Sequence, residues 1–293
     1  MKKRSLCSAL VAALALPSLA LAQEASPNTG AIHFGADLNF ATSYFFRGYN
    51  QEDTGLIFQP NVYGYVDFLE DVDENATISG LRLKVGSWNS LHSEQNGPDS
   101  DVWYESDIYG VATMTFASSL YVNLGYTIYT YPGDALETTH EVGVSVGFDD
   151  TQLWTNMGVT GFGLKPEIGV YKEIADRNGT QDTYGEVKVT PGLVIDRELI
   201  PGFGKAGISF PVVLGLSVED YYLDSDGDNE LFGYIQGGVA VSLPITGIPA
   251  RYGSWNLVGG VNYIHMLADS VEIANDGGED YEVQGTIGLS MTY

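Results

Sequence analysis

The final thirteen residues, YEVQGTIGLSMTY (281–293), place apolar and polar or small side chains at alternate positions. A period of two is the pattern of a β-strand with one apolar face, because successive side chains point to opposite sides of a sheet. Strands of soluble sandwiches are usually about 5 or 6 residues long, whereas a tilted strand needs about 9 to 11 residues to cross a bilayer. The stretch therefore predicts a strand long enough to span a membrane.

The same alternation recurs throughout the preceding chain. It predicts twelve segments, over residues 31–46, 56–68, 77–89, 102–116, 119–131, 138–148, 162–173, 182–195, 205–221, 230–243, 252–267 and 280–293. We interpret residues 31–293 as an all-β fold, an antiparallel transmembrane β-barrel of about 12 strands with no plug domain. A soluble β-sandwich also alternates and stays open as a rival fold, and residues 149–161 could contain strand of their own.

The connections between these segments are of two kinds. Those after odd-numbered segments are acidic and polar, and they cover residues 47–55, 90–101, 132–137, 174–181, 222–229 and 268–279. Those after even-numbered segments are very short or carry proline and aliphatic residues, as at 196–204 and 244–251. With a periplasmic N-terminus, the first kind faces outward, and an even number of strands returns the C-terminus to the periplasm.

The N-terminus has the pattern of a secretory signal. Basic residues within 1–4 precede an apolar stretch and then Ala20-Leu21-Ala22, which is a cleavage site of the A-x-A type. We expect residues 1–22 to be a signal peptide and residues 23–30 a short flexible lead. Export and the barrel pattern together predict the outer membrane of a Gram-negative-type cell.

The chain is acidic, with 13 Lys+Arg against 38 Asp+Glu and a formal net charge of −25. Nucleic acid is therefore excluded as an expected partner, because phosphate backbones bind basic surfaces. The one cysteine, Cys7, lies in the predicted signal peptide. The mature chain is thus expected to form neither an intramolecular disulfide nor a thiolate metal site, and no cofactor is predicted.

The C-terminal segment resembles the terminal-strand signal of outer-membrane barrel proteins, in which an apolar phase ends on an aromatic residue. The residues that carry this resemblance are Ile287, Leu289, Met291 and Tyr293. The usual last residue of that signal is Phe, so Tyr293 is a mild departure. The resemblance implies two partners, the barrel-insertion machinery and outer-membrane lipid.

A second resemblance lies in TSYFFRGYNQE (42–52) and LKVGSWNS (83–90). These stretches resemble the TorF-type outer-membrane porin family, in which a first strand ends in Tyr-x-Phe-Arg-Gly and a later strand ends in Gly-x-Trp. The match covers under a third of the chain, at Tyr44, Phe46, Arg47, Gly48, Gln51, Gly86 and Trp88. The resemblance implies location and architecture, and it does not specify a solute.

If the apolar phase faces lipid, the polar phase lines the barrel interior, or lumen. The candidate pore-lining residues are Arg47, Arg82, Lys84, Glu105, Asp107, Lys165, Glu167, Glu186, Lys188, Tyr63 and Tyr65. Symmetric hairpins would set Lys84 opposite Asp107, and Glu167 opposite Lys188. Such charges either brace the wall or form a narrow opening through which small polar solutes pass.

Aromatic residues of the apolar phase near strand ends predict two girdles at the membrane surfaces. The outer level is assigned the aromatic residues Tyr44, Phe46, Phe58, Tyr104, Tyr263 and Tyr281, and the periplasmic level Phe68, Phe116, Phe148, Phe162, Trp255 and Tyr293, all of which would face lipid. Two such girdles favour a barrel over a sandwich, in which the same rings would belong to the core.

Patterns for catalysis and metal binding are weak. Only His92 has a serine two positions away, Ser90, as barrel phospholipases require, and no carboxylate is evident for the pair. We therefore expect no enzymatic activity. The loop at 224–230 has carboxylates at alternate positions, which suits Ca²⁺, but it lacks the EF-hand glycine and final Glu. Its candidate ligands are Asp224, Asp226, Asp228 and Glu230.

The expected function is passive diffusion of small polar solutes through an outer-membrane channel. A cation preference is expected because acidic residues outnumber basic ones in the assigned lumen. Two rivals stay open: a structural or surface-interaction barrel without conductance, and a soluble secreted β-sandwich that binds a partner. The sequence leaves open the solute and the number of chains per assembly.

Overall fold

The computed structural model describes residues 28–69, 77–94, 102–117, 119–133, 136–175, 182–275 and 278–293. The predicted signal peptide (1–22) and residues 23–27 of the lead lie outside these residues. The described chain is nearly all β, as the period of two predicts. Its two α-helices have six residues each, and no described helix has the length and apolar character needed to cross a membrane.

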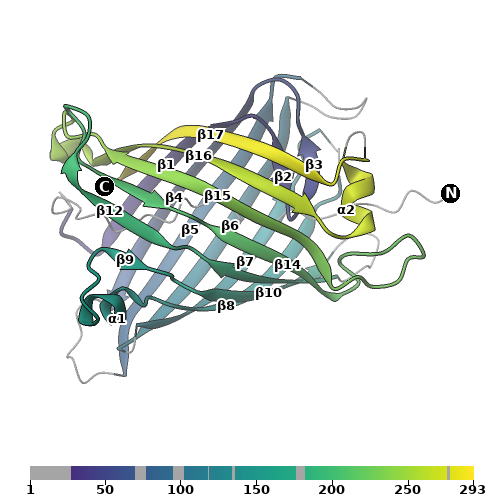
Figure 1. The fold of residues 1–293 in the computed structure, drawn as a ribbon, viewed down its shortest axis with the longest axis horizontal. Helices are drawn as coiled ribbons and strands as arrows, with labels where there is room; N and C mark the ends of the chain where they lie inside the picture. The colour runs from purple at the N-terminus through teal and green to yellow at the C-terminus, as the bar shows by residue number, and fades with distance from the viewer. Residues whose placement is uncertain are drawn as a thin grey trace.

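Twelve antiparallel strand positions close into a barrel (Figure 1). Nine positions are single strands: β1 (Ile32–Ala41), β4 (Ile57–Leu69), β5 (Ile78–His92), β6 (Trp103–Phe116), β7 (Leu120–Thr130), β8 (Thr139–Phe148), β15 (Phe232–Pro244), β16 (Ser254–Met266) and β17 (Tyr281–Thr292). Three positions are two strands in succession: β9 (Phe162–Gly163) with β10 (Glu167–Ala175), β11 (Thr183–Val189) with β12 (Gly192–Glu198), and β13 (Lys205–Ser209) with β14 (Val212–Glu219). The first strand pairs with the last, and β14 pairs with β15, so the ring has no free edge.

The divided positions keep one register across each break. Glu167 pairs with Lys188 on one side of a break and Gly163 with Gly192 on the other, so neither strand slips. The residues at the three breaks include Pro166, Pro191 and Pro211. Proline has no N–H to donate to a ladder, so each break is a gap in hydrogen bonding within a continuous strand. The prediction of an antiparallel barrel of about twelve strands is confirmed.

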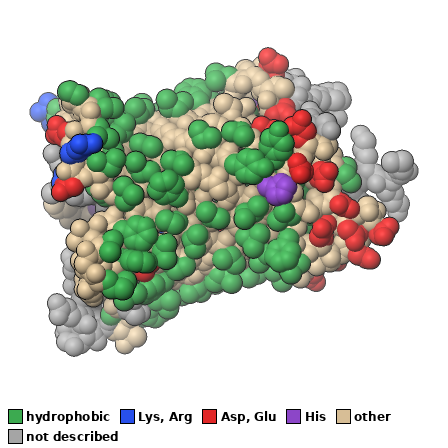
Figure 2. All heavy atoms as spheres, in the orientation of Figure 1, with side chains coloured by type: hydrophobic (Ala, Val, Ile, Leu, Met, Phe, Trp, Pro, Cys, Tyr) green, Lys and Arg blue, Asp and Glu red, His purple; other side chains and the backbone are tan. Residues whose placement is uncertain are grey.

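Alternate side chains face the outside and the lumen. Ile108 is 61% exposed, whereas the adjacent Asp107 is fully buried. Figure 2 shows apolar side chains spread over the middle of the barrel surface and acidic side chains gathered at one end. An apolar belt of this kind suits the hydrocarbon region of a bilayer, in which a closed barrel satisfies all its backbone hydrogen bonds.

The two ends of the barrel differ. One end carries α2 (Asp269–Ala274) and the acidic loop 220–230, and we call it the hairpin end. The other carries α1 (Thr151–Asn156), the 3₁₀-helix η1 (Ala250–Tyr252) and the C-terminus, and we call it the turn end. The described parts of the predicted outward loops lie at the hairpin end. The segment 149–161, which could have contained a further strand, contains the helix α1 instead.

The first predicted strand is shorter than expected, and the loop after it folds inward. β1 ends at Ala41, and the side-chain amide of Gln284 donates to the carbonyl of Ser43 at 2.7 Å where the chain turns into the lumen. β2 (Tyr44–Phe46) and β3 (Tyr49–Glu52) then form a separate hairpin. Tyr44 is 6% and Phe46 4% exposed, so their assignment to a lipid-facing girdle is wrong.

A β-bulge overturns the girdle assignment of Tyr104. Ser90 pairs with Glu105 while Leu91 pairs with Trp103, so Tyr104 is an extra residue on β6. A bulge breaks the alternation of faces, which lets two successive side chains point the same way. Trp103 is accordingly 48% exposed, whereas Tyr104 and Glu105 are both buried in the lumen.

Candidate functional site: the plugged lumen

The β2–β3 hairpin occupies the lumen near the hairpin end. Its two-residue turn, Arg47-Gly48, has positive φ at both positions, 48° and 86°. This is the requirement of a type I′ turn, for which glycine is suited and arginine is not. A Cβ on Gly48 would lie 3.0 Å from Tyr234 and Val271, so the second position also needs glycine for space.

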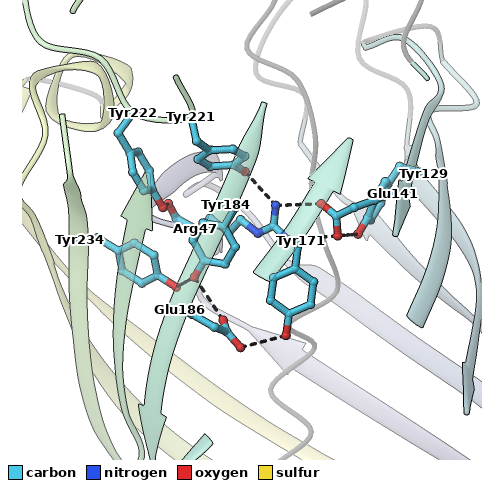
Figure 3. Close-up of polar contacts among 9 residues, drawn as sticks. All are labelled: Arg47, Tyr129, Glu141, Tyr171, Tyr184, Glu186, Tyr221, Tyr222 and Tyr234. Carbon is cyan, nitrogen blue, oxygen red and sulfur yellow. Dashed lines mark hydrogen bonds and ion pairs between the residues drawn. The ribbon is translucent and has the colours of Figure 1, made fainter. Parts of the chain in front are cut away.

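Arg47 is held by a carboxylate of the barrel wall (Figure 3). Its Nη1 and Nη2 donate to the two oxygens of Glu141, on β8, at 3.0 and 3.2 Å. Both side chains are 1% exposed, so the ion pair is almost dry. A buried pair of this kind is strongly destabilised when one partner is removed, because the other charge is left uncompensated.

Aromatic rings surround the same guanidinium. Its Cζ lies 3.9 Å from the ring centroid of Tyr184, on β11, and 5.2 Å from those of Tyr171 and Tyr221. Cation–π contacts contribute about 2 kcal/mol or more when both groups are desolvated. We call Glu141, Tyr171, Tyr184 and Tyr221 the wall cage.

A second carboxylate orients the cage rings. The hydroxyls of Tyr171 and Tyr184 donate to Glu186 at 3.2 and 3.1 Å (Figure 3). Tyr222 donates to the backbone carbonyl of Arg47 at 2.9 Å. The wall cage therefore holds the Arg47 side chain, and Tyr222, outside the cage, holds the backbone of the same turn.

The other side of the hairpin packs on β5 and β6. The Tyr44 hydroxyl donates to Glu105 at 2.8 Å, and its ring centroid lies 5.4 Å from that of Trp88. Tyr104, the bulge residue, donates to Gln51 at 2.8 Å. The two stretches that resemble the TorF-type family are thus in contact with each other in the lumen.

A serine, a histidine and a glutamate meet at the base of the hairpin. Ser90 Oγ lies 2.8 Å from Nε2 of His92, whose Nδ1 lies 3.7 Å from Glu52 of β3. The sequence pattern had indicated no carboxylate for the Ser90 and His92 pair, and the hairpin supplies one. Ser90 is fully buried and His92 is 2% exposed. In this conformation the three side chains form a buried contact between the hairpin and the barrel wall.

The lumen near the turn end holds a second group of cations over rings. Arg82 donates to both oxygens of Asp67, at 2.6 and 2.9 Å, and its Cζ lies 4.1 Å from the Tyr65 ring. The Lys84 ammonium lies 5.4 Å from the Tyr63 ring. Here the cations are partly hydrated, since the Arg82 side chain is 47% exposed.

One predicted cross-strand pair forms and the other does not. Lys188 contacts Glu167 at 2.8 Å and Glu186 at 3.9 Å, so the pairing predicted for Glu167 is confirmed. The predicted pairing of Lys84 with Asp107 is wrong, because Lys84 pairs with Val111. β5 runs on to His92, which moves the centre of the hairpin. The displacement is an even number of residues, so side chains away from the bulge at Tyr104 keep their facing.

Lys165 lies at the break between β9 and β10. Its backbone N–H and that of Leu164 donate to Asp150 at 2.9 Å, and the Trp154 indole donates to the same carboxylate at 2.7 Å. Burial raises the pKa of Asp150, but these donors outweigh burial and hold that pKa below its usual range. The carboxylate ties α1 to the barrel at the turn end.

The acidic loop uses its carboxylates as backbone acceptors. Asp224 accepts from the N–H groups of Asp226 and Asp228, at 2.9 Å each, and Glu230 accepts from that of Asp269 at 3.1 Å. Within the described residues, no group of three or more His, Cys, Asp or Glu side chains is arranged to hold a metal ion.

The sequence-based list of pore-lining candidates lacks five residues that surround Arg47: Glu141, Tyr171, Tyr184, Tyr221 and Tyr222. Tyr184 shares the strand face of Glu186, so the period of two contained a signal for it. Tyr221 and Tyr222 follow β14 in an acidic loop, where no periodicity indicates that their rings turn back into the lumen.

No protein-family model matches the chain. A serine–tRNA ligase of Mycolicibacterium vanbaalenii is 28% identical over 136 residues, which span 44% of this chain and 30% of the ligase. The match thus leaves more than two thirds of the ligase uncovered.

Three solved structures to which the chain is similar are an outer-membrane channel and two autotransporter domains. An outer-membrane channel from Pseudomonas putida F1 is 7% identical with a TM-score of 0.45, over 91% of this chain and 96% of that one. The β-domain of the Bordetella autotransporter BrkA is 10% identical with a TM-score of 0.43, over 90% and 99%. The translocator domain of the Neisseria meningitidis autotransporter NalP is 13% identical with a TM-score of 0.40, over 90% and 89%.

Proposed function

We propose that this chain is an outer-membrane channel for passive diffusion of small polar solutes, with a preference for cations, and that the β2–β3 hairpin controls its opening. One observation carries the proposal: a closed barrel with an apolar belt encloses a lumen lined by charged and aromatic side chains. Barrels that only brace a membrane fill that space with wall side chains. Here a separate hairpin fills part of it, and a hairpin can withdraw.

The location and the family belong to the same proposal. The signal pattern at 1–22 supports export, and the terminal strand supports insertion by the barrel-insertion machinery. The contact between the two TorF-like stretches in the lumen supports membership of that porin family. The rival is a barrel that serves structure or surface interaction, in which the hairpin never withdraws and no current flows.

The cation preference follows from the lumen charges. Arg47, Arg82 and Lys188 each face a carboxylate, and Lys188 faces two, whereas the lumen residue Asp37 forms no ion pair among the described residues. Unpaired carboxylates leave a negative potential, which concentrates cations in the pore.

Reversal potentials across a KCl gradient in a planar bilayer test this preference. We expect a K⁺-selective sign that moves further toward K⁺ in Lys84→Gln, because a lumen cation is removed. Lys172→Gln is the matched control, since Lys172 pairs with the exposed Glu219 and should leave the sign and size unchanged. A Cl⁻-selective sign in the unaltered protein would refute the preference, and absence of current would favour the structural rival.

The contact of Ser90, His92 and Glu52 favours a second candidate, a hydrolase. It has the order of contacts of a nucleophile, base and acid. A substrate, however, must reach the Ser90 hydroxyl, which is fully buried and also lies 3.5 Å from the amide of Gln59.

We therefore expect no reaction of the folded protein with a fluorophosphonate probe, which labels activated serines. The measurement is mass spectrometry of the intact protein, with Ser90→Ala as the control. Labelling that disappears in Ser90→Ala would establish the hydrolase instead.

A further inference from the structure

We propose that the wall cage is a recognition site for solutes that carry a guanidinium group, and that Arg47 is its tethered occupant in the closed conformation. The proposal names a class of solute for the proposed channel. Transport of that solute rests on the proposed channel function, whereas its binding to the wall cage does not.

The cage is independent of the group that it holds. Glu141 lies on β8, Tyr171 on β10 and Tyr184 on β11, and Tyr221 follows β14. These strands are paired to each other in the barrel wall, whereas Arg47 comes from a short hairpin that pairs only with itself. Withdrawal of the hairpin would remove the Arg47 side chain and leave Glu141, Tyr171 and Tyr184 on their wall strands, while Tyr221 would lose the hydrogen bond that its carbonyl accepts from Tyr49 of β3.

The geometry suits a planar cation. Two parallel hydrogen bonds, at 3.0 and 3.2 Å, join the guanidinium edge to both oxygens of Glu141. Its face lies 3.9 Å from the centre of the Tyr184 ring. A carboxylate fork combined with a flat ring selects guanidinium over ammonium, which is a compact charge without an edge or a face.

An empty cage would attract a cation. In the closed conformation Glu141 is almost fully buried, and the hydroxyl of Tyr129 donates to it at 3.4 Å. Glu186 lies close by and adds to the negative potential through its bonds with Tyr171 and Tyr184. A carboxylate fork beside the faces of aromatic rings attracts a cation more strongly than a neutral or anionic solute.

Arg47 can be displaced by competition. Its backbone is held in the left-handed region, which a non-glycine residue adopts at a cost. A group on a short flexible tether competes with an effective concentration on the order of millimolar, and the other contacts of the hairpin raise this value for Arg47. Exchange of the Arg47 side chain for a free guanidinium-bearing solute, and release of the hairpin tip, therefore require the solute at millimolar concentration or above.

To test the proposal, the Arg47 guanidinium is removed by mutation and free methylguanidinium is added. Purified full-length Arg47→Ala in detergent is titrated with methylguanidinium by calorimetry. We expect saturable binding with one site per chain. Binding should weaken by about tenfold or more in Arg47→Ala with Glu141→Gln, because the charge-assisted fork is lost. Methylammonium should also bind Arg47→Ala more weakly than methylguanidinium.

The matched control is Arg251→Ala, which removes an exposed arginine whose Cζ lies 4.8 Å from the Tyr252 ring at the turn end. It should create no binding of methylguanidinium. Absence of saturable binding to Arg47→Ala, or equal binding with and without Glu141, would overturn the proposal.

A measurement on the unaltered protein keeps the proposal testable if Arg47→Ala does not fold. Millimolar methylguanidinium should speed hydrogen exchange of backbone amides in residues 44–52, and methylammonium should do so less. Unchanged exchange would overturn the proposal. A silent bilayer recording, by contrast, would refute the channel and leave this binding result intact.

Discussion

Replacement of Arg47 by Ala should open the channel through the lumen and lower the stability of the folded protein. The change leaves Glu141 buried without its counter-charge, which costs about 3 to 5 kcal/mol. It also removes the cation that stacks on Tyr184. If the lost free energy comes from docking of the hairpin in the lumen, the equilibrium constant for docking falls by a factor on the order of 10² or more. We expect larger or more frequent current steps in planar bilayers and a lower temperature of unfolding.

A double-mutant cycle separates the ion pair from general damage. Glu141→Gln alone should also destabilise, because it leaves the guanidinium buried without a carboxylate. Arg47→Met alone should destabilise for the same reason as Arg47→Ala, whereas Arg47→Met combined with Glu141→Gln removes both charges and should recover much of the free energy of unfolding. Strictly additive losses would contradict the role of the pair.

Replacement of Ile287 by Arg should impair assembly of the barrel. Ile287 is 58% exposed at the middle of β17, where it pairs with Phe40 and Gly259 of the neighbouring strands. A charged side chain on the lipid face near the bilayer centre costs roughly 2 to 4 kcal/mol. The measurement is the yield of folded barrel on refolding into lipid vesicles.

The control is the adjacent residue, Thr286, which lies on the lumen phase of the same strand. Thr286→Arg should refold with a higher yield, because the guanidinium points into the interior. Equal losses for the two substitutions would mean that the assigned facing of β17 is wrong.

The period of two carried most of the fold. It predicted the number of strand positions, the facing of residues such as Asp107 and Ile108, and the pairing of Glu167 with Lys188. The facing survives errors of register. β5 and β6 are displaced by an even number of residues from the symmetric hairpin, so Lys84 loses Asp107 as its partner but stays in the lumen.

Local irregularities defeated the same reasoning. The bulge at Tyr104 reverses the facing of Trp103 and Tyr104. The alternation of polar and apolar residues in the sequence does not indicate this bulge. Tyr44 and Phe46 continue the apolar phase of β1 in the sequence, yet they belong to a hairpin inside the barrel. Burial of an aromatic ring against lipid and burial against a plug require the same residue types, so composition does not separate the two.

The alternation along the chain was therefore sufficient for a closed barrel with an apolar exterior and a charged interior, because facing depends only on neighbouring residues. The contents of the lumen depend on groups that are distant in sequence. Arg47 meets Glu141 and Tyr184, and Glu52 meets His92, only because the ring closes around the folded hairpin. Contacts between a loop and opposite walls follow from closure of the barrel in three dimensions, and no periodicity along the chain encodes them.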